Sequence, residues 1–281
     1  LYMQSLGETV EDLSVIIYSG GLPVGLLLLH ATKKGSLFQF SSSGNDISSP
    51  LFRSEIPRNL AKKLTVKLLD CLFQLMGEGT CSEITIQDNA ILTLITKHIG
   101  DWSLYGLLLG GEPKVTFDIF VDLSLSIDEI RARYRKSYKP FINKGLREWD
   151  YKIFDKSNID MSTWDEFRVF HKTTAGRVTR SIETWDAQYD MVISGVAFLV
   201  VLRDPSGLNM VGAALFQHSR DEGLYSVAAY DRTLFDKPLG HVVQQLAIEE
   251  LKKTNVRFYV LGERTYSKLT PIPTKKESDI S

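Results

Sequence analysis

The stretch from 225 to 253 joins a strand, a polar turn and a helix, an order that can create an anion site. Residues 224–229 have the length and small side chains of a strand, residues 231–237 are polar, and Pro238 suits the first turn of a helix. Apolar residues then recur at helical spacing. Gly240 leaves the backbone N–H groups of the first turn open, and these groups and the helix dipole attract anions. The pattern favours a phosphate or pyrophosphate site, although most strand–turn–helix units bind no anion.

A second polar stretch, residues 171–181, gathers one histidine, two arginines and several hydroxyl groups. Arg177 and Arg180 are three residues apart, and two guanidinium groups can hold a phosphate or carboxylate through paired N–H donors. The plainer interpretation is a loop between two helices, with Ser181 or Thr184 as the N-cap of the second helix. The sequence leaves both interpretations open.

Residues 126–151 are the most basic part of a chain whose formal net charge is -1. Ser126 and Glu129 form a capping box, so a helix begins there. Pro140 must kink or split that helix because it removes an interior hydrogen bond. The segment is either a solvated helix face or a landing site for phosphate groups of RNA or of a phosphorylated small molecule. Its cations are Arg131, Arg133, Arg135, Lys136, Lys139, Lys144 and Arg147.

Other kinds of site have no signature in this sequence. The five histidines are scattered singly, and Cys71 and Cys81 lack ligand partners at close spacing, so we expect no metal. The glycine pairs at Gly20 and Gly110 follow no phosphate-loop pattern. No nucleophile–base pair is visible, and no tightly bound cofactor is expected.

Composition sets the broad class of the protein. A hydrophobic fraction of 43% and a charged fraction of 24% are those of a soluble globular protein. Two cysteines do not suggest a disulfide framework, so a reducing cytoplasm is the expected location. No apolar run reaches the roughly 20 residues of a membrane-spanning helix. The sequence therefore predicts no transmembrane segment and is compatible with contact at a membrane surface.

The periodicity of apolar residues predicts a mixed α+β chain of two similar lobes. In the first half we expect strands at 15–18, 22–31, 37–40, 83–87, 104–109 and 114–121, and helices at 58–77 and 91–98. In the second half we expect helices at 163–173, 182–194 and 239–253, and strands at 197–203, 210–218, around Tyr225 and at 257–261. Each lobe is expected to be a mostly antiparallel sheet flanked by helices. The expected divisions are an N-terminal lobe at 6–125, a basic helical connector at 126–155 and a C-terminal, active lobe at 156–281.

A lobe whose third strand leads into a helix N-terminus resembles the GNAT acyltransferase fold, and two such lobes joined by a segment like 121–155 resemble the FemABX-like transferases. In the joining segment the resemblance rests on Asp122, Leu123, Ser124, Ile130, Arg135, Lys136, Ile142 and Lys144. In the second lobe it rests on Phe170-His171, Ala175-Gly176-Arg177, Thr179-Arg180-Ser181, Thr184-Trp185, Val211-Gly212, Tyr225 and Leu261-Gly262. The family continues into a last strand with an aromatic–lysine step, which we expect to be absent here or to lie beyond Ser281.

The resemblance implies transfer of an acyl group to an amine. FemABX members move an amino acid from aminoacyl-tRNA to an amine of a peptidoglycan precursor, whereas other GNAT enzymes use acyl-CoA and hold its pyrophosphate in an Arg/Gln-x-x-Gly-x-Gly/Ala loop. Residues 236–241 match that loop only at Gly240, and Pro238 has no N–H to donate. This departure favours aminoacyl-tRNA or another unusual donor. The implied acceptor is a primary amine of an amino sugar, a peptide or a cell-envelope precursor.

In a GNAT-like lobe, the strand at Tyr225 would offer a backbone N–H to the acyl carbonyl. Tyr230 would protonate the leaving group, and Asp231 or His241 would take the proton of the amine. The plainer alternatives are a half-buried tyrosine with a wet hydroxyl and a structural histidine. Contacts to the donor are expected from Lys237, Gly240, Gln244, Arg131, Arg135 and Lys136. Contacts to the acceptor substrate are expected from His171, Arg177, Arg180, Ser181 and Tyr225.

Two rival functions remain at the level of sequence. One is an acetyl-CoA-dependent GNAT N-acetyltransferase. The other is a module without catalytic activity, whose basic connector binds RNA or a protein partner. Donor contact near Gly240 distinguishes the enzyme from the module.

Overall fold

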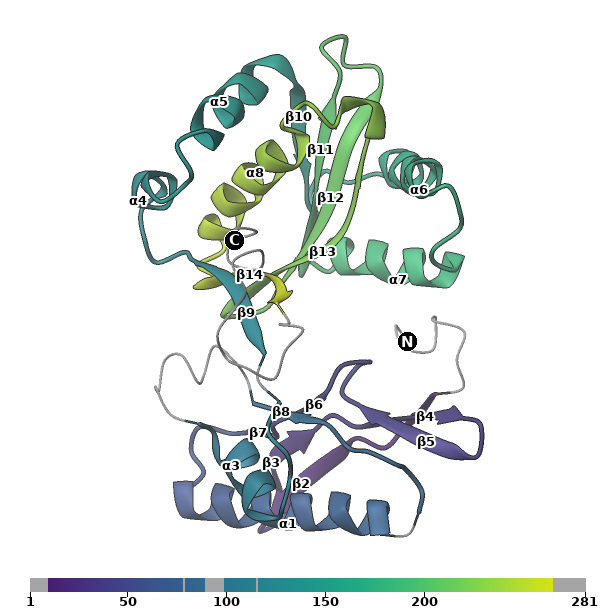
Figure 1. Ribbon diagram of the computed structural model, residues 1–281, viewed down its shortest axis with the longest axis vertical. Helices are drawn as coiled ribbons and strands as arrows, with labels where there is room; N and C mark the ends of the chain where they lie inside the picture. The colour runs from purple at the N-terminus through teal and green to yellow at the C-terminus, as the bar shows by residue number, and fades with distance from the viewer. Residues whose placement is uncertain (1–9, 78, 89–98, 115, 265–281) are drawn as a thin grey trace. The chain divides into compact units, whose positions relative to one another are not determined.

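The computed structural model describes residues 10–77, 79–88, 99–114 and 116–264 (Figure 1). The chain divides into two compact units, Leu1–Lys114 and Val115–Ser281. This division lies earlier than the expected boundary after residue 125, because β9 (Phe117–Asp122) pairs with β14 (Phe258–Arg264) and so belongs to the second unit. The expected connector also packs into the second unit, where Ile130 and Trp149 enter its core.

The first unit consists of short antiparallel strands and two helices around one small core. Its sheets have the strand orders β1-β4-β5, β2-β3-β7 and β6-β8, and only the last pair is parallel. The expected hairpin is present as β2 and β3, but the expected strand at 22–31 divides into β3 and the start of β4, which belong to different sheets. The core packs Leu27, Ile47, Leu69 and Trp102 together. The elements are β1 (Val10–Asp12), β2 (Val15–Ser19), β3 (Leu22–Leu27), β4 (His30–Lys34), β5 (Leu37–Ser41), β6 (Ile47–Ser48), β7 (Leu51–Phe52), α1 (Arg58–Gly77), β8 (Ile86–Gln87) and α3 (Asp101–Leu108).

The strand expected at 104–109 is wrong, because residues 104–108 lie in helix α3 and Leu109 is its C-cap. An apolar run this short fits a strand or a buried helix equally well by periodicity. The structure buries Trp102 and Gly106, which are one helical turn apart. A Cβ on Gly106 would lie 2.5 Å from Cδ1 of Ile86, so the helix packs closely against β8 there. The strand expected at 83–87 is only two residues long, and the helix expected at 91–98 lies outside the described residues.

The second unit contains one six-stranded sheet with the order β10-β11-β12-β13-β14-β9. All neighbouring strands are antiparallel except β13 and β14, which are parallel. The strands β11 to β13 are long, and the side chains of β11 and β12 are mostly buried, as expected for strands covered on both faces of a sheet. Besides β9 and β14, this sheet contains β10 (Asp150–Phe154), β11 (Ala197–Arg203), β12 (Met210–His218) and β13 (Glu222–Tyr230).

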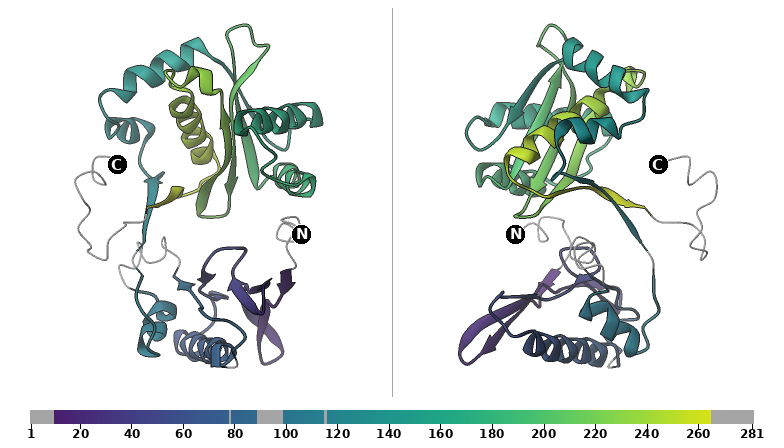
Figure 2. Two further views of the ribbon diagram at one scale, coloured as in Figure 1. Left: turned by 45° about the vertical axis from the view of Figure 1, so that its right-hand side comes forward. Right: turned by 90° about the vertical axis from the view of Figure 1, so that its left-hand side faces the viewer.

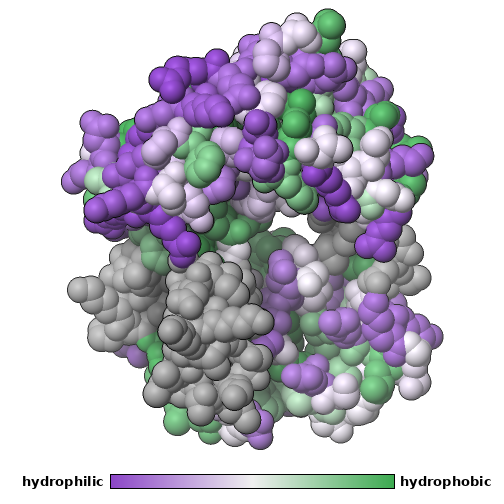
Figure 3. All heavy atoms as spheres, turned by 45° about the horizontal axis from the view of Figure 1, so that its top comes forward, coloured by the Kyte–Doolittle hydropathy of each residue, from purple (hydrophilic) through white to green (hydrophobic). Residues whose placement is uncertain are grey.

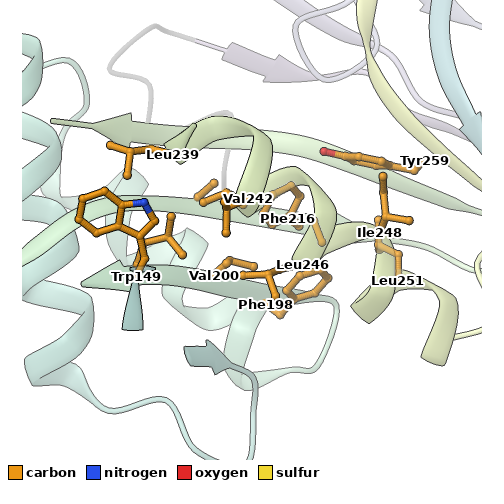
Figure 4. Close-up of a cluster of buried hydrophobic side chains, with 14 of the residues drawn as sticks. Trp149, Phe198, Val200, Phe216, Leu239, Val242, Leu246, Ile248, Leu251 and Tyr259 are labelled. Atoms are coloured by element: carbon orange, nitrogen blue, oxygen red, sulfur yellow. The ribbon is translucent and has the colours of Figure 1, made fainter. Parts of the chain in front are cut away.

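Helices cover both faces of this sheet and enclose two separate cores (Figures 1 and 2). On one face, α8 (Leu239–Lys253), α5 (Tyr138–Glu148) and α4 (Ile127–Ala132) contribute to a core that includes Trp149 and Phe216 (Figure 4). On the other face, α6 (Met161–Ala175) and α7 (Ile182–Ile193) pack Trp164 and Trp185 against the sheet. The expected α+β class, with mostly antiparallel sheets flanked by helices, is confirmed. No helix in the described part of the chain is long and apolar enough to cross a membrane.

The basic segment begins and breaks much as its sequence predicts. Both bonds of the capping box between Ser126 and Glu129 are present at the start of α4. The helix is split as expected, but the break lies at residues 133–137, before Pro140. Pro140 occupies the first turn of α5, where its missing N–H would have no helical partner in any case.

Candidate functional site

The parallel strands β13 and β14 separate after three paired residues. Their register runs from Glu222 opposite Phe258 to Leu224 opposite Val260. Beyond that point β13 pairs only with β12, while β14 continues alongside β9 (Figure 2). Within the described residues, no strand pairs with the edge of β13 that faces this fork. Backbone N–H and C=O groups on an open edge are available to a ligand, for example to an acyl carbonyl.

Helix α8 begins next to the second half of β13. Its N-cap is Pro238, whose side chain makes no capping hydrogen bond. The first N–H groups of the helix therefore have no acceptor from an N-cap side chain. Gly240 lies above the ring of Tyr230, since a Cβ there would be 3.8 Å from Cζ of the tyrosine. This distance is an ordinary contact, so packing alone does not require glycine at this position. An open helix start of this kind fits an anionic group.

Four polar side chains meet where β13, β14 and α8 come together, and we name them the hydroxyl cluster: Tyr225, Tyr230, Gln244 and Tyr259. The hydroxyl oxygens of Tyr225 and Tyr230 are 3.2 Å apart. The hydroxyl of Tyr259 donates to Oε1 of Gln244. Sequence reasoning selected three members but missed Tyr259, because its contact with the cluster depends on how β14 pairs.

Burial keeps the phenols of the hydroxyl cluster neutral. It strongly raises the pKa of Tyr230, and the neighbouring Tyr225 adds to the effect. Burial likewise raises the pKa of Tyr259 and of Tyr225, although hydrogen bonds from Tyr230 and Gln244 oppose the shift at Tyr225. A phenol of this kind holds its proton and donates a hydrogen bond. Tyr230 therefore suits polarisation of a carbonyl or leaving group better than complete release of its proton.

Of the two candidate bases, Asp231 precedes the open helix start in the chain and His241 lies in the first turn of α8. The carboxylate of Asp231 caps the short 3-10 turn η2 (Arg232–Leu234) and accepts from the N–H of Thr233 at 2.8 Å and from its hydroxyl at 2.7 Å. The ring of His241 packs edge-on against Tyr138, with the centroids 4.5 Å apart, and burial lowers the pKa of His241. A neutral imidazole can accept a proton, whereas Asp231 already has a structural role.

The basic segment packs against the start of α8. A Cβ on Gly145 would lie 2.4 Å from Cγ2 of Val242 and 3.3 Å from Cγ of Pro238, so α5 and α8 touch closely there. The guanidinium of Arg135 lies 5.8 Å from the ring centroid of Tyr138, which itself contacts His241. Many of the cationic side chains on this segment are exposed, and Figure 3 shows hydrophilic residues gathered over this part of the second unit. Cations and an open helix start thus lie close together.

The other expected donor contacts have mixed environments. Arg131 donates to Asn143 within the basic segment, and Lys136 is exposed. Lys237 forms an ion pair of 3.6 Å with Asp236 just before α8. Gln244 is tied to Tyr259 in the hydroxyl cluster.

The loop at 171–181 lines a pocket of about 450 Å³ between α6 and α7. His171, Arg180 and Ser181 all line it, as expected of residues that act together. Ser181 is also the N-cap of α7, so the plainer interpretation of this residue is confirmed. Arg177 is exposed and is not among the lining residues, and Tyr225 lies in the hydroxyl cluster instead. The expected substrate residues therefore divide between two places.

The sequence analysis gave no binding role to three polar or aromatic residues that line this pocket: Arg168, Trp185 and Lys172, which lies within the singled-out stretch. Arg168 and Lys172 are four residues apart on α6, so they share a helix face with His171, and this spacing was a usable signal. Trp185 was recognised only as part of the resemblance. No group of three potential metal ligands occurs among the described residues.

No protein-family profile matches this chain, and no characterised protein matches it in sequence. Among solved structures, FemX aligns with a TM-score of 0.66 at 12% identity, over 96% of this chain and 84% of FemX. The protein named L-PGS from Bacillus licheniformis aligns with a TM-score of 0.55 at 13% identity, over 99% of this chain and 76% of that chain. The C-terminal domain of a putative lysylphosphatidylglycerol synthetase from Agrobacterium fabrum aligns with a TM-score of 0.53 at 13% identity, over 89% of this chain and 70% of that chain. The chain thus has the FemABX-like, GNAT-type fold that its sequence predicts, and the likeness extends over both units.

Proposed function

We propose that the second unit transfers an acyl or aminoacyl group from a donor to a primary amine. The observation that carries this proposal is the fork between β13 and β14, which opens next to the hydroxyl cluster and the open start of α8. One place thereby offers backbone groups that no described strand pairs with, a neutral hydroxyl for a leaving group and an anion-binding helix end. The FemX-like fold supports the same reaction class by analogy.

In the proposed reaction, the amine nitrogen attacks the acyl carbon of the donor. The C–N bond forms, the bond from the acyl carbon to the oxygen or sulfur of the leaving group breaks, and the amine proton is lost. N–H groups on the open edge of β13 stabilise the oxyanion, and Tyr230 donates a hydrogen bond to the leaving group. His241 accepts the amine proton, with Asp231 as the alternative base, and this proton then passes to the oxygen or sulfur of the leaving group.

The proposed donor is an aminoacyl-tRNA. Its support is the position of the basic segment, because Arg135, Tyr138 and His241 connect that segment to the start of α8. Exposed cations attract a polyphosphate backbone, whereas a single coenzyme needs only the helix end. The proposed acceptor is the amine of an amino sugar, a peptide or a cell-envelope precursor.

A transfer assay with mass-spectrometric detection of the acylated amine tests this proposal. Aminoacyl-tRNA and acetyl-CoA are offered separately, each with a panel of amine acceptors. Product from aminoacyl-tRNA supports the proposed donor, and product from acetyl-CoA alone shows an N-acetyltransferase. Absence of product from either, with binding of uncharged tRNA retained, would show that transfer is not the function.

The substitution Gly240→Asp separates donor binding from folding. A carboxylate in the first turn favours the helix through its dipole but repels an anionic donor. We expect unchanged or higher thermal stability together with at least tenfold weaker donor binding. The matched control, Gly240→Ala, fits the space above Tyr230 without a charge and is expected to bind the donor normally.

One observation favours a second function, RNA binding without catalysis. The basic segment presents seven cations, and Asp128, Glu129, Glu148 and Asp150 are the acidic residues among them. The double reversal Arg135→Glu with Lys136→Glu is expected to abolish salt-sensitive tRNA binding under either function. If the protein is an RNA-binding module without catalytic activity, Gly240→Asp should leave tRNA binding unchanged, whereas it should weaken donor binding by the enzyme.

A further inference from the structure

We propose that the pocket between α6 and α7 binds an amphiphilic anion, with one carboxylate or phosphate group on a short aliphatic chain. The pocket is lined by residues of α6, α7 and the loop between them. These two helices lie on the face of the sheet opposite α8 (Figure 1). Its volume of about 450 Å³ is within the range of small-molecule sites. The proposal concerns binding at this pocket and does not depend on the transfer reaction.

The charge of the lining calls for an anion. Arg168, Lys172 and Arg180 line the pocket, and no acidic residue does. Arg168 is partly neutralised by Asp165 at 2.9 Å. Among the described residues, no carboxylate lies within ion-pair distance of Lys172 or Arg180. Within the part of the chain that the structure describes, two cations at this pocket therefore have no carboxylate as counter-charge.

The guanidinium of Arg180 is held in place from one side only. Its Nη1 donates to Nε2 of His171 and to Oγ1 of Thr179, each at 3.3 Å, and its carbon lies 5.8 Å from the ring centroid of Trp185. In the described part of the structure, its Nη2 and Nε have no partner. These two donors form the fork that binds a carboxylate or phosphate in a bidentate manner.

The neutral form of His171 holds the guanidinium of Arg180 in position. Because a guanidinium only donates, Nε2 of His171 must accept, and the ring proton lies on Nδ1, which is 3.5 Å from Oγ1 of Thr179. Burial lowers the pKa of His171, and the charge of Arg180 adds to that shift. The histidine thus acts as a positioning residue for Arg180 and leaves the positive charge to the guanidinium.

The rim of the pocket is aliphatic. Val169, Val178 and Ile182 line it and are 60%, 67% and 61% exposed, while Trp185 is buried behind them. Three exposed aliphatic side chains beside a cationic centre match a ligand with an acidic head and an apolar chain. An inorganic anion would leave these side chains in water.

Isothermal titration calorimetry on the full chain, with hexanoate, acetate, hexyl phosphate, inorganic phosphate and hexanol, tests the proposal. We expect one of the two C6 anions to bind at least tenfold more tightly than hexanol and than its own short counterpart, with roughly two- to fourfold per buried methylene. A preference for hexyl phosphate assigns the head group as phosphate, and the reverse assigns it as carboxylate.

Variants locate the binding site. Arg180→Gln is expected to weaken binding of the preferred anion at least tenfold, and Lys172→Gln severalfold. The matched control is Arg177→Gln, which makes the same change on the same loop outside the pocket and is expected to bind normally. Circular dichroism confirms that each variant is folded. Equal affinity for hexanol and the anions, no binding of any probe, or equal losses in Arg177→Gln and Arg180→Gln would each overturn the proposal.

Discussion

On the α8 side of the second-unit sheet, the side chains of the hydroxyl cluster are buried or half-buried and hydrogen-bond within the cluster, whereas on the α6–α7 side polar groups line an open pocket. The difference is one of solvation. Buried phenols lose water and stay neutral, so they can direct hydrogen bonds but cannot hold a charge. Partly solvated cations at a pocket keep their charge and can attract an anion from solution. One sheet thus supports a site suited to polarising a bond and a site suited to binding a charged group.

The substitution Tyr230→Phe is the sharpest way to break this comparison. It removes the hydroxyl proposed to face the leaving group, so we expect kcat to fall by about a hundredfold, or about 2.7 kcal/mol in activation free energy, with little change in KM. The lost neutral hydrogen bond to Tyr225 should lower the free energy of unfolding by only about 1 kcal/mol. Steady-state kinetics and urea unfolding measure the two effects.

The matched control for that experiment is Tyr259→Phe. It removes a hydroxyl of the same cluster that is committed to Gln244, so its kcat should fall far less. Equal losses of kcat in the two variants would mean that the cluster supports the fold of the site as a whole and that Tyr230 has no special position.

Gly145→Ala tests whether the basic segment must sit against α8. The added Cβ would lie 2.4 Å from Cγ2 of Val242, a buried and stiff β-branched side chain, so the helices must move apart. We expect a loss of about 1–3 kcal/mol in the free energy of unfolding. Gly240→Ala is the matched helical control and should be neutral or stabilising by up to about 1 kcal/mol, since its Cβ meets only ordinary contacts. Similar denaturation midpoints for the two variants would contradict the close contact of α5 with α8.

The sequence predicts the long helices accurately and the fork not at all. Residues 58–77 and 239–253 coincide with α1 and α8, because each helix combines an apolar stripe with a clear terminal signal. The separation of β13 from β14 depends on β9, which is distant in sequence and pairs with the far edge of β14. Local periodicity contains no information about such a pairing.

The same limit explains the partial success at the α6–α7 loop. Spacing showed that Arg177 and Arg180 are near one another, but only the packing of His171 and Trp185 decides that Arg180 is the one held at the pocket. The apolar run in α3 was misread for a related reason: its length suits both a strand and a buried helix, and only contact with β8 distinguishes them.

The pH dependence of stability provides a smaller effect on the α6–α7 side. The folded-state pKa of His171 is lowered by burial and by Arg180, so the unfolded chain binds its proton first as the pH falls. Its contribution to stability is therefore present above the unfolded value of about 6.5 and is lost below it. His218 and His241 have pKa values lowered in the same direction and add to the slope.

Thermal unfolding of the protein and of His171→Gln at pH 8, 7, 6 and 5 isolates the contribution of His171 to the pH dependence of stability. Glutamine can still accept a hydrogen bond from Arg180 but does not titrate in this range. We expect the variant to lose less stability between pH 7 and pH 5 than the protein itself. Parallel curves for the two proteins would show that the pKa of His171 is the same in the folded and the unfolded chain.

Lys144→Gln gives the smallest expected effect and addresses what the charges on α5 are for. Its ammonium pairs with Glu148 at 4.0 Å, and its side chain is 60% exposed. Such pairs contribute about 0.3–0.5 kcal/mol, so urea unfolding should show a change below about 0.5 kcal/mol. Arg203→Gln is the contrasting variant on the α6 side, because both terminal nitrogens of Arg203 donate to Glu166, and we expect a loss of about 1–2 kcal/mol there. If Lys144→Gln instead costs as much as Arg203→Gln, the cations of the basic segment stabilise the fold. Their proposed role toward a polyanionic donor would then lose its main support, since exposed charges that contribute nothing to folding are the ones left to act on a ligand.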